Sequence, residues 1–119
     1  LRISTMQTPT LKFLTSNILT LLLMTSTAHA ENHKALATQE AVACEESAKK
    51  GDVTEALRHA EAGKAHAEAA KAERSNPHLD AGIRNLDEAI TNARAGKAHD
   101  TEESASAAVT HLLAAEKAF

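Results

Sequence analysis

Aromatic side chains are almost absent from this sequence, which has two Phe, no Tyr and no Trp among 119 residues. Proteins that hold single-stranded nucleic acid stack its bases on aromatic rings, and those that hold duplexes need a surplus of Lys and Arg. Here the formal net charge is −3 at pH 7. The composition therefore argues against a nucleic-acid partner.

Cysteine and methionine are equally scarce. Cys44 is the single cysteine, so no disulfide forms within the chain, and the Cys-x-x-Cys-His motif of covalent haem attachment is missing. Both methionines, Met6 and Met24, fall within the first thirty residues. If those residues are removed, no methionine is left to serve as an axial haem ligand, which disfavours a four-helix cytochrome.

Residues 1–30 have the three parts of a secretory signal peptide. Arg2 and Lys12 provide positive charge, residues 13–24 are mainly apolar, and residues 28–30 read Ala-His-Ala, a small-x-small cleavage site. The apolar run is short for a membrane span and is interrupted by polar residues. We therefore expect export to the periplasm, cleavage, and a mature domain at residues 31–119 with no membrane attachment. An uncleaved anchor is the alternative.

The mature part is predicted to be all α, with four helices. The first covers about residues 33–50 and ends at Gly51. The second opens with an Asp52 capping box and runs to about residue 73. The third begins at Asn76-Pro77, a good N-cap followed by proline at the first helical position, and ends at Gly96. A second capping box at residues 100–103 opens the last helix, which runs to about residue 118. No segment alternates as a strand would.

Short turns between helices of similar length predict an up-down-up-down four-helix bundle. The third helix has the clearest apolar stripe. Its members recur every three or four residues: Leu79, Ile83, Leu86, Ile90 and Ala93.

The other inward faces are thin and rich in alanine. Helix one offers Leu36 or Ala37 with Ala41, Cys44 and Ala48; helix two offers Val53, Leu57, Ala60 and Ala67, or Ala56, Ala60, Gly63 and Ala67; helix four offers Ala105, Val109, Leu112 and Phe119. So little buried apolar area predicts marginal stability, which dimerisation or a ligand would raise, and we expect a monomer or weak homodimer.

A shift of 45 residues superposes the two halves of the mature chain. It lays His33 on His78, His66 on His111 and Gly51 on Gly96. We interpret this as a duplicated helical hairpin.

Four histidines are predicted to gather near one end of the bundle. His33 lies 18 residues before the Gly51 turn and His66 lies 15 residues after it, so an antiparallel hairpin places them at nearly the same height. His78 and His111 repeat this arrangement around Gly96. Imidazole suits copper, nickel and zinc, so these four are candidate ligands contributed by different helices.

Two further pairs lie within single helices, Glu55 with His59 and His99 with Glu103, each four residues apart. Each pair is a weak auxiliary site. The alternative is that the histidines are ordinary solvated polar residues. If Leu79 and Leu112 point inward, the neighbouring His78 and His111 lie on the flanks or on the solvent side. Cys44 is interpreted as a small packing residue, with a Cu(I) ligand or a dimer-forming thiol as alternatives.

Several segments of the chain resemble the small metal-binding protein family. They read Asn-Pro-His-Leu-Asp-Ala-Gly-Ile at 76–83, Leu-Asp-Glu-Ala-Ile at 86–90, Gly-Lys-Ala-His at 96–99 and Ala-Val-Thr-His-Leu at 108–112. Residues 58–62 and 64–67 resemble its histidines spaced by seven. The resemblance implies a periplasmic four-helix bundle that binds copper and other divalent metals, to buffer or sequester them. The matching positions are His59, His66, His78, His99 and His111, with His33 at the start.

These observations favour a non-enzymatic periplasmic protein for copper, with nickel and zinc as further candidates. No nucleophile and base motif is present, and bulky residues to wall a dry pocket are missing. The alternative function is a helical interaction or stress protein that presents its surface to a protein partner.

Overall fold

The computed structural model describes residues 32–118, which form four helices and the turns between them, with Asn32 directly before the first helix. The four helices are α2 (His33–Lys49), α3 (Val53–Glu73), α4 (Pro77–Arg94) and α5 (Ala98–Ala118). The predicted signal peptide at residues 1–30 and the predicted core residue Phe119 lie outside these residues. None of the helices described is both long and apolar enough to cross a membrane.

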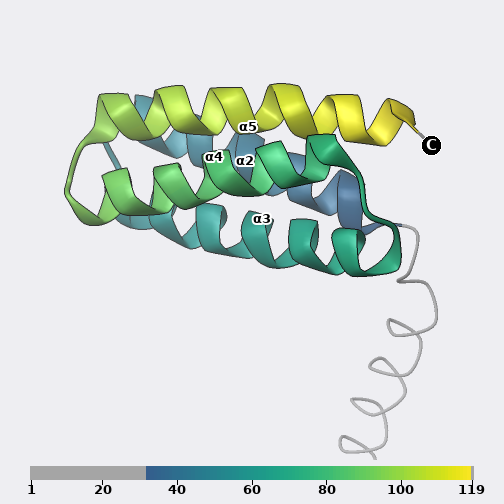
Figure 1. Cartoon of the computed structure of the whole chain (residues 1–119). Coiled ribbons are helices and arrows are strands. Elements are labelled where there is room, and N and C mark those ends of the chain that lie inside the picture. The colour runs from purple at the N-terminus through teal and green to yellow at the C-terminus, as the bar shows by residue number, and fades with distance from the viewer. Residues whose placement is uncertain (1–31, 119) are drawn as a thin grey trace, which may run out of the picture. The chain divides into compact units, whose positions relative to one another are not determined.

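The helices form the predicted up-down-up-down bundle (Figure 1). Each packs against its sequence neighbours, and α2 closes the ring by packing against α5. Residues 32–118 lie in one compact unit, and its core is closed by its own four helices.

Local sequence signals explain where three of the four helices begin or end. Gly51 and Gly96 have φ of +81° and +76°, a left-handed backbone that glycine adopts without strain, and they follow α2 and α4. The side chain of Asn76 accepts a hydrogen bond from the amide of His78 at 2.7 Å, as an N-cap does. The Asp52 side chain likewise accepts from the amide of Glu55 at 3.1 Å.

The second capping box was predicted wrongly. The last helix begins at Ala98, two residues before the box, so Asp100 already lies in its first turn. The amide of Thr101 donates to the carbonyl of Lys97 at 3.0 Å, and the Thr101 hydroxyl donates to the same oxygen at 2.7 Å. Lys97 therefore starts the helix directly after the Gly96 turn, and Thr101 is fully buried instead of capping.

Alanine fills most of the core, and Leu79, Leu86 and Leu112 are its largest fully buried side chains. The sequence allowed two inward faces for α3. In the structure the buried face contains Ala56, Ala60, Gly63 and Ala67. In α2 it is Ala37, not Leu36, that is buried, and Cys44 is buried two turns further along the same face. Ile83 and Val109, both expected inward, are partly exposed and pack against the edge of the core. Alanine lets helices approach closely, so larger residues are displaced to the flanks.

Candidate metal centre

The first histidine pair joins α2 to α3. His33 and His66 are half-buried, their Nδ1 atoms are 3.2 Å apart, and their ring centroids are 5.4 Å apart with the planes inclined by 33°. A hydrogen bond between two imidazole nitrogens needs one N–H and one lone pair, so one ring donates and the other accepts. The height argument from the Gly51 turn placed these two residues correctly.

The distance between the two nitrogens can be compared with the distance between two ligand atoms on one metal ion. Imidazole nitrogens bind Zn²⁺ at about 2.0–2.1 Å, so two nitrogens 3.2 Å apart would subtend an angle of about 100–105° at the ion. That angle is near the tetrahedral value. The pair therefore fits two adjacent positions of a tetrahedral ion, with the remaining positions open.

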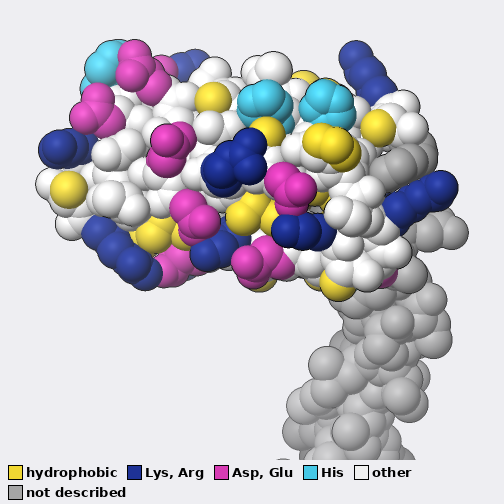
Figure 2. Space-filling model, viewed as in Figure 1, with side chains coloured by type: hydrophobic (Ala, Val, Ile, Leu, Met, Phe, Trp, Pro, Cys, Tyr) yellow, Lys and Arg dark blue, Asp and Glu magenta, His cyan; other side chains and the backbone are white. Residues whose placement is uncertain are grey.

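The second pair joins α4 to α5 at the equivalent place. The rings of His78 and His111 are stacked, with centroids 6.4 Å apart and planes inclined by 27°. His78 is exposed and His111 is half-buried, so this pair is more exposed to solvent than the first. Histidine side chains reach the molecular surface among interleaved acidic and basic groups (Figure 2).

His59 meets a carboxylate that the sequence analysis did not select. Its Nδ1 lies 2.7 Å from Oε1 of Glu40 on α2, whereas its Nε2 is 3.7 Å from Oε1 of Glu55. Glu55 is instead bound by Arg58 at 2.6 Å, and this hydrogen bond lowers the pKa of the Glu55 carboxyl. The auxiliary pair of Glu55 and His59 is thus looser than the contact between His59 and Glu40.

The height rule that pairs His33 with His66 also pairs Glu40 with His59. Glu40 lies 11 residues before Gly51 and His59 lies 8 after it, so the offset of three residues is the same. The two contacts are one heptad apart, about 10.5 Å along the helices, which is too far for one ion to span. They form a ladder of two levels between α2 and α3.

His99 stands apart from both hairpin pairs. Its side chain is 78% exposed, with Nε2 3.4 Å from Glu103 and Nδ1 3.7 Å from Glu102. These contacts lie within the first two turns of α5. The pair His99 and Glu103 is therefore a surface pair in high dielectric, where weak binding is expected.

Cys44 is fully buried in the core between the helices. Burial, with a smaller effect from Glu45, raises the pKa of its thiol to about 11. The group is a protonated thiol at neutral pH, and the thiolate is the form that binds metal. This agrees with a packing role.

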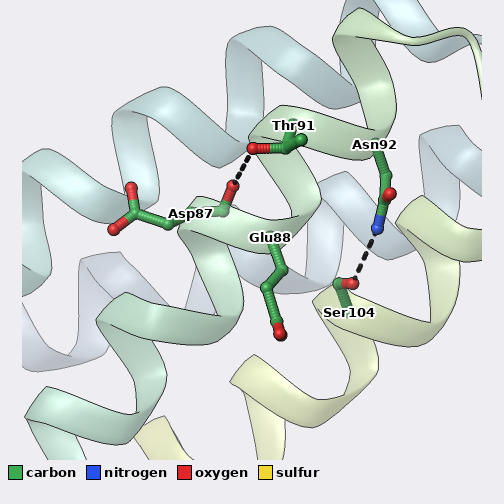
Figure 3. Close-up of a pocket in the computed structure, with 5 residues that line it drawn as sticks. All are labelled: Asp87, Glu88, Thr91, Asn92 and Ser104. Carbon is green, nitrogen blue, oxygen red and sulfur yellow. Dashed lines mark hydrogen bonds between the residues drawn. The ribbon is translucent and has the colours of Figure 1, made fainter.

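A polar groove between α4 and α5 holds no histidine. It is lined by Asp87, Glu88, Thr91, Asn92 and Ser104, and Glu88 extends toward α5 (Figure 3). Asn92 donates to Ser104 at 3.2 Å, which closes part of it. Oxygen and amide groups alone suit hard cations and not copper, so this groove is not the candidate metal centre.

The structure therefore brings the four hairpin histidines together as two pairs. Within residues 32–118, no group of three or more His, Cys, Asp or Glu side chains is arranged to hold a metal ion. Each pair supplies two nitrogens, and water, a neighbouring side chain after a rotamer change or another molecule would complete the coordination of an ion.

Comparison with known proteins gives the family of the chain. A search of curated proteins found no match. The model of the small metal-binding protein family, however, matches residues 8–115, which includes all four helices except the end of α5. Over nearly its whole length the chain belongs to the small metal-binding protein family, and this membership implies that it binds metal ions.

Proposed function

We propose that this protein buffers or sequesters copper, and with lower preference nickel and zinc, in the periplasm. The observation that carries the proposal is the 3.2 Å separation between Nδ1 of His33 and Nδ1 of His66, which matches two adjacent positions around a transition metal. The signal-peptide pattern of residues 1–30 supports the periplasmic location.

Two nitrogens per site suit a buffering role better than a permanent structural one. Structural metal sites in proteins have four closed ligands, whereas a pair leaves positions open for exchange. An ion in such a site is retained while free metal is abundant and is released to a better ligand set. The metal is cargo in this scheme, and we assign no catalytic step to the protein.

For both Nδ1 atoms of the first pair to bind one ion, the proton on the donating Nδ1 has to move to Nε2 of the same ring, so that each neutral imidazole offers an Nδ1 lone pair. Ligand nitrogens must be unprotonated to bind a metal, so binding releases protons and weakens as the pH falls. The net formal charge of −3 has the sign that favours cations.

The test is a calorimetric titration of residues 31–119 with Cu(II), Ni(II) and Zn(II) at about pH 7 and about pH 5. We expect saturable copper binding with a dissociation constant on the order of 1 μM or tighter at the higher pH, and its loss at the lower pH. His66→Ala and His111→Ala should each remove one copper ion. Losing the second ligand of a pair should weaken that site by roughly a factor of 100 or more.

His99→Ala is the matched control, because it removes an exposed histidine that belongs to neither hairpin pair. The tight copper binding of this variant should match the parent, and only the weak binding expected at the pair of His99 and Glu103 should be lost. Unchanged stoichiometry and affinity in the His66→Ala, His111→Ala double variant would refute the assignment of the pairs as metal sites.

A further inference from the structure

His59 has a carboxylate on each side of its ring. Its Nδ1 lies 2.7 Å from Oε1 of Glu40 on α2, and its Nε2 lies 3.7 Å from Oε1 of Glu55 on its own helix. The first distance is that of a good hydrogen bond, and the second is too long for one. The two ring nitrogens therefore have different roles, and the contact with Glu40 decides which role each has.

The hydrogen bond to Glu40 selects the tautomer of His59. An ionised carboxylate has no proton to donate, so the nitrogen that faces it has to carry the N–H. In the neutral ring the proton is thus on Nδ1, and Nε2 keeps its lone pair. That lone pair and the lone pairs of Glu55 are then two acceptors 3.7 Å apart with no proton between them. Such an arrangement attracts a cation.

A metal ion fits between Nε2 of His59 and Oε1 of Glu55. With ligand distances of about 2.0–2.2 Å, two atoms 3.7 Å apart subtend an angle of about 120–135° at the ion. This angle is wider than the tetrahedral value, and a small rotation of either side chain reduces it. Both side chains are half-buried, so water has access to the remaining positions of the ion.

The packing of α2 against α3 keeps Glu40 in place. Gly63 follows His59 by one turn of α3, and a Cβ added to Gly63 would lie only 3.3 Å from Cβ of Glu40. The backbone of α3 is therefore close to the stem of Glu40. The Glu40 side chain is 30% exposed, compared with 45% for Glu55, and a shielded hydrogen bond to a charged group is stronger than one in water. Glu40 is thus held as an acceptor before any ion arrives.

We propose that Glu40 is a positioning residue for metal binding, which holds His59 with its proton on Nδ1 so that Nε2 and Glu55 bind one divalent ion. The inference rests on the proposed metal function and adds to it a site with one nitrogen and one carboxylate oxygen. A carboxylate that accepts from the second nitrogen of a ligand histidine strengthens metal binding by roughly 10- to 100-fold. The second hairpin lacks this arrangement, because its equivalents of Glu40 and His59 are Asn85 and Ser104.

Arg58 competes with the ion for Glu55. Its Nη2 donates to Oε1 of Glu55 at 2.6 Å, and its Nε donates to Oε2 at 3.3 Å. A guanidinium on the same oxygen that faces Nε2 opposes a metal ion there, because it is positively charged and uses one of the lone pairs. Removal of Arg58 should therefore strengthen the site.

The tautomer can be measured without metal. In ¹⁵N-labelled residues 31–119, the ring chemical shifts of His59 distinguish the protonated nitrogen from the one with the lone pair, at a pH at which the ring is neutral. We expect the proton on Nδ1 in the parent and in Glu40→Gln, whose amide oxygen still accepts, and a mixture of tautomers in Glu40→Ala. A parent ring with its proton on Nε2 would overturn the proposal.

Titration of the same samples with Zn(II) tests the site itself. This ion is diamagnetic, so binding at Nε2 moves the ¹⁵N resonance of that atom while Nδ1 keeps its proton. We expect the dissociation constant measured at His59 to rise roughly tenfold in Glu40→Ala and by less in Glu40→Gln. Both variants lose the same charge, so the difference between them isolates the hydrogen bond. Equal weakening in the two variants, or none in either, would refute the positioning role.

Arg58→Ala tests the competition for Glu55. Zinc binding measured at His59 should tighten by roughly threefold, as expected when a surface ion pair is removed. Lys71→Ala is the control, because it removes the same charge from α3 about 18 Å further along the helix axis, beyond the Debye length at physiological salt. Affinity that is the same in both variants would show that Glu55 is not a ligand.

The same titration separates this proposal from the proposed function. The ring resonances of His33 and His66 report zinc at that pair, independently of the resonances of His59. Zinc that shifts the resonances of the pair and leaves Nε2 of His59 unmoved would overturn the role of Glu40 and Glu55 alone. Zinc that shifts Nε2 of His59 supports this site even if the pair does not bind.

Discussion

Raising the pH should destabilise the fold through Cys44. Burial raises the pKa of this thiol from 9.0 to about 11, so the folded protein holds the proton over a range in which the unfolded chain has lost it. The stabilising effect of this difference is fully present below pH 9 and is lost as the pH rises toward 11. One pH unit corresponds to about 1.4 kcal/mol, so the free energy of unfolding should fall by about 3 kcal/mol across this window.

The measurement is urea unfolding at several pH values from about 8 to 11, followed by circular dichroism. Lysines also titrate in this range, so the informative quantity is the difference between the parent and Cys44→Ala. The alanine variant should be less stable at pH 8 because it leaves a small cavity, and the gap should close or reverse as the pH rises. A gap that stays constant with pH would show that Cys44 is not a buried, protonated thiol.

Three further substitutions test the packing and caps that hold the histidine pairs in place. Asn76→Ala removes the N-cap of α4 and should cost about 1 kcal/mol of stability, measured by urea unfolding. Gly82→Ala places a Cβ 2.8 Å from Cδ2 of the fully buried Leu112, so strain of about 1–3 kcal/mol should exceed the helix-propensity gain of about 1 kcal/mol and lower the melting temperature. Glu40→Ala should cost about 1 kcal/mol, and a double-mutant cycle with His59→Ala should give a coupling of similar size; additive effects would mean that the 2.7 Å contact contributes nothing.

Helix boundaries were predictable wherever a backbone constraint is local. The N-cap at Asn76 and the turns at Gly51 and Gly96 follow from residues that fix φ or satisfy a free amide within three positions. The start of α5 was missed because two local signals compete there. A capping box at residues 100–103 is plausible in isolation, but the Gly96 turn already places Lys97 at the helix entrance.

The inward face of α3 could not be chosen from its sequence. Both candidate faces contain Ala60 and Ala67, so the apolar pattern has no clear direction. The outcome depends on how closely α3 approaches its neighbours. A Cβ added to Gly63 would lie 3.3 Å from Cβ of Glu40 and 3.4 Å from Cδ1 of Leu86, so glycine is found where the helices are nearest. Such distances are properties of the assembled bundle.

The sequence predicted which histidines lie at the same height in the bundle, but it did not predict every residue that they contact. Counting residues from the turns paired His33 with His66 and His78 with His111, and the structure has both pairs. Glu40 was not predicted as a partner of His59, because carboxylates were paired only with histidines of the same helix, although the same count pairs these two residues. How two side chains at the same height are oriented depends on their rotamers and burial, which cannot be predicted by counting residues.

The two hairpins have only one level of the α2/α3 ladder in common. Its first level, His33 and His66, is kept in the second hairpin as His78 and His111. The second level is not kept, because the repeat of Glu40 is Asn85 and the repeat of His59 is Ser104.

In the second hairpin, Asn85 donates to Glu88 at 3.2 Å and Ser104 accepts from Asn92. These are neutral amide and hydroxyl groups, which bind transition metals poorly compared with imidazole and carboxylate. In the first hairpin, moreover, His33 and His66 are in direct hydrogen-bond contact. Their rings are held close before an ion arrives, so less ordering of side chains opposes binding there. On the proposed copper function, the first hairpin should therefore bind copper before the second, although both hairpins contain the equivalent histidine pair.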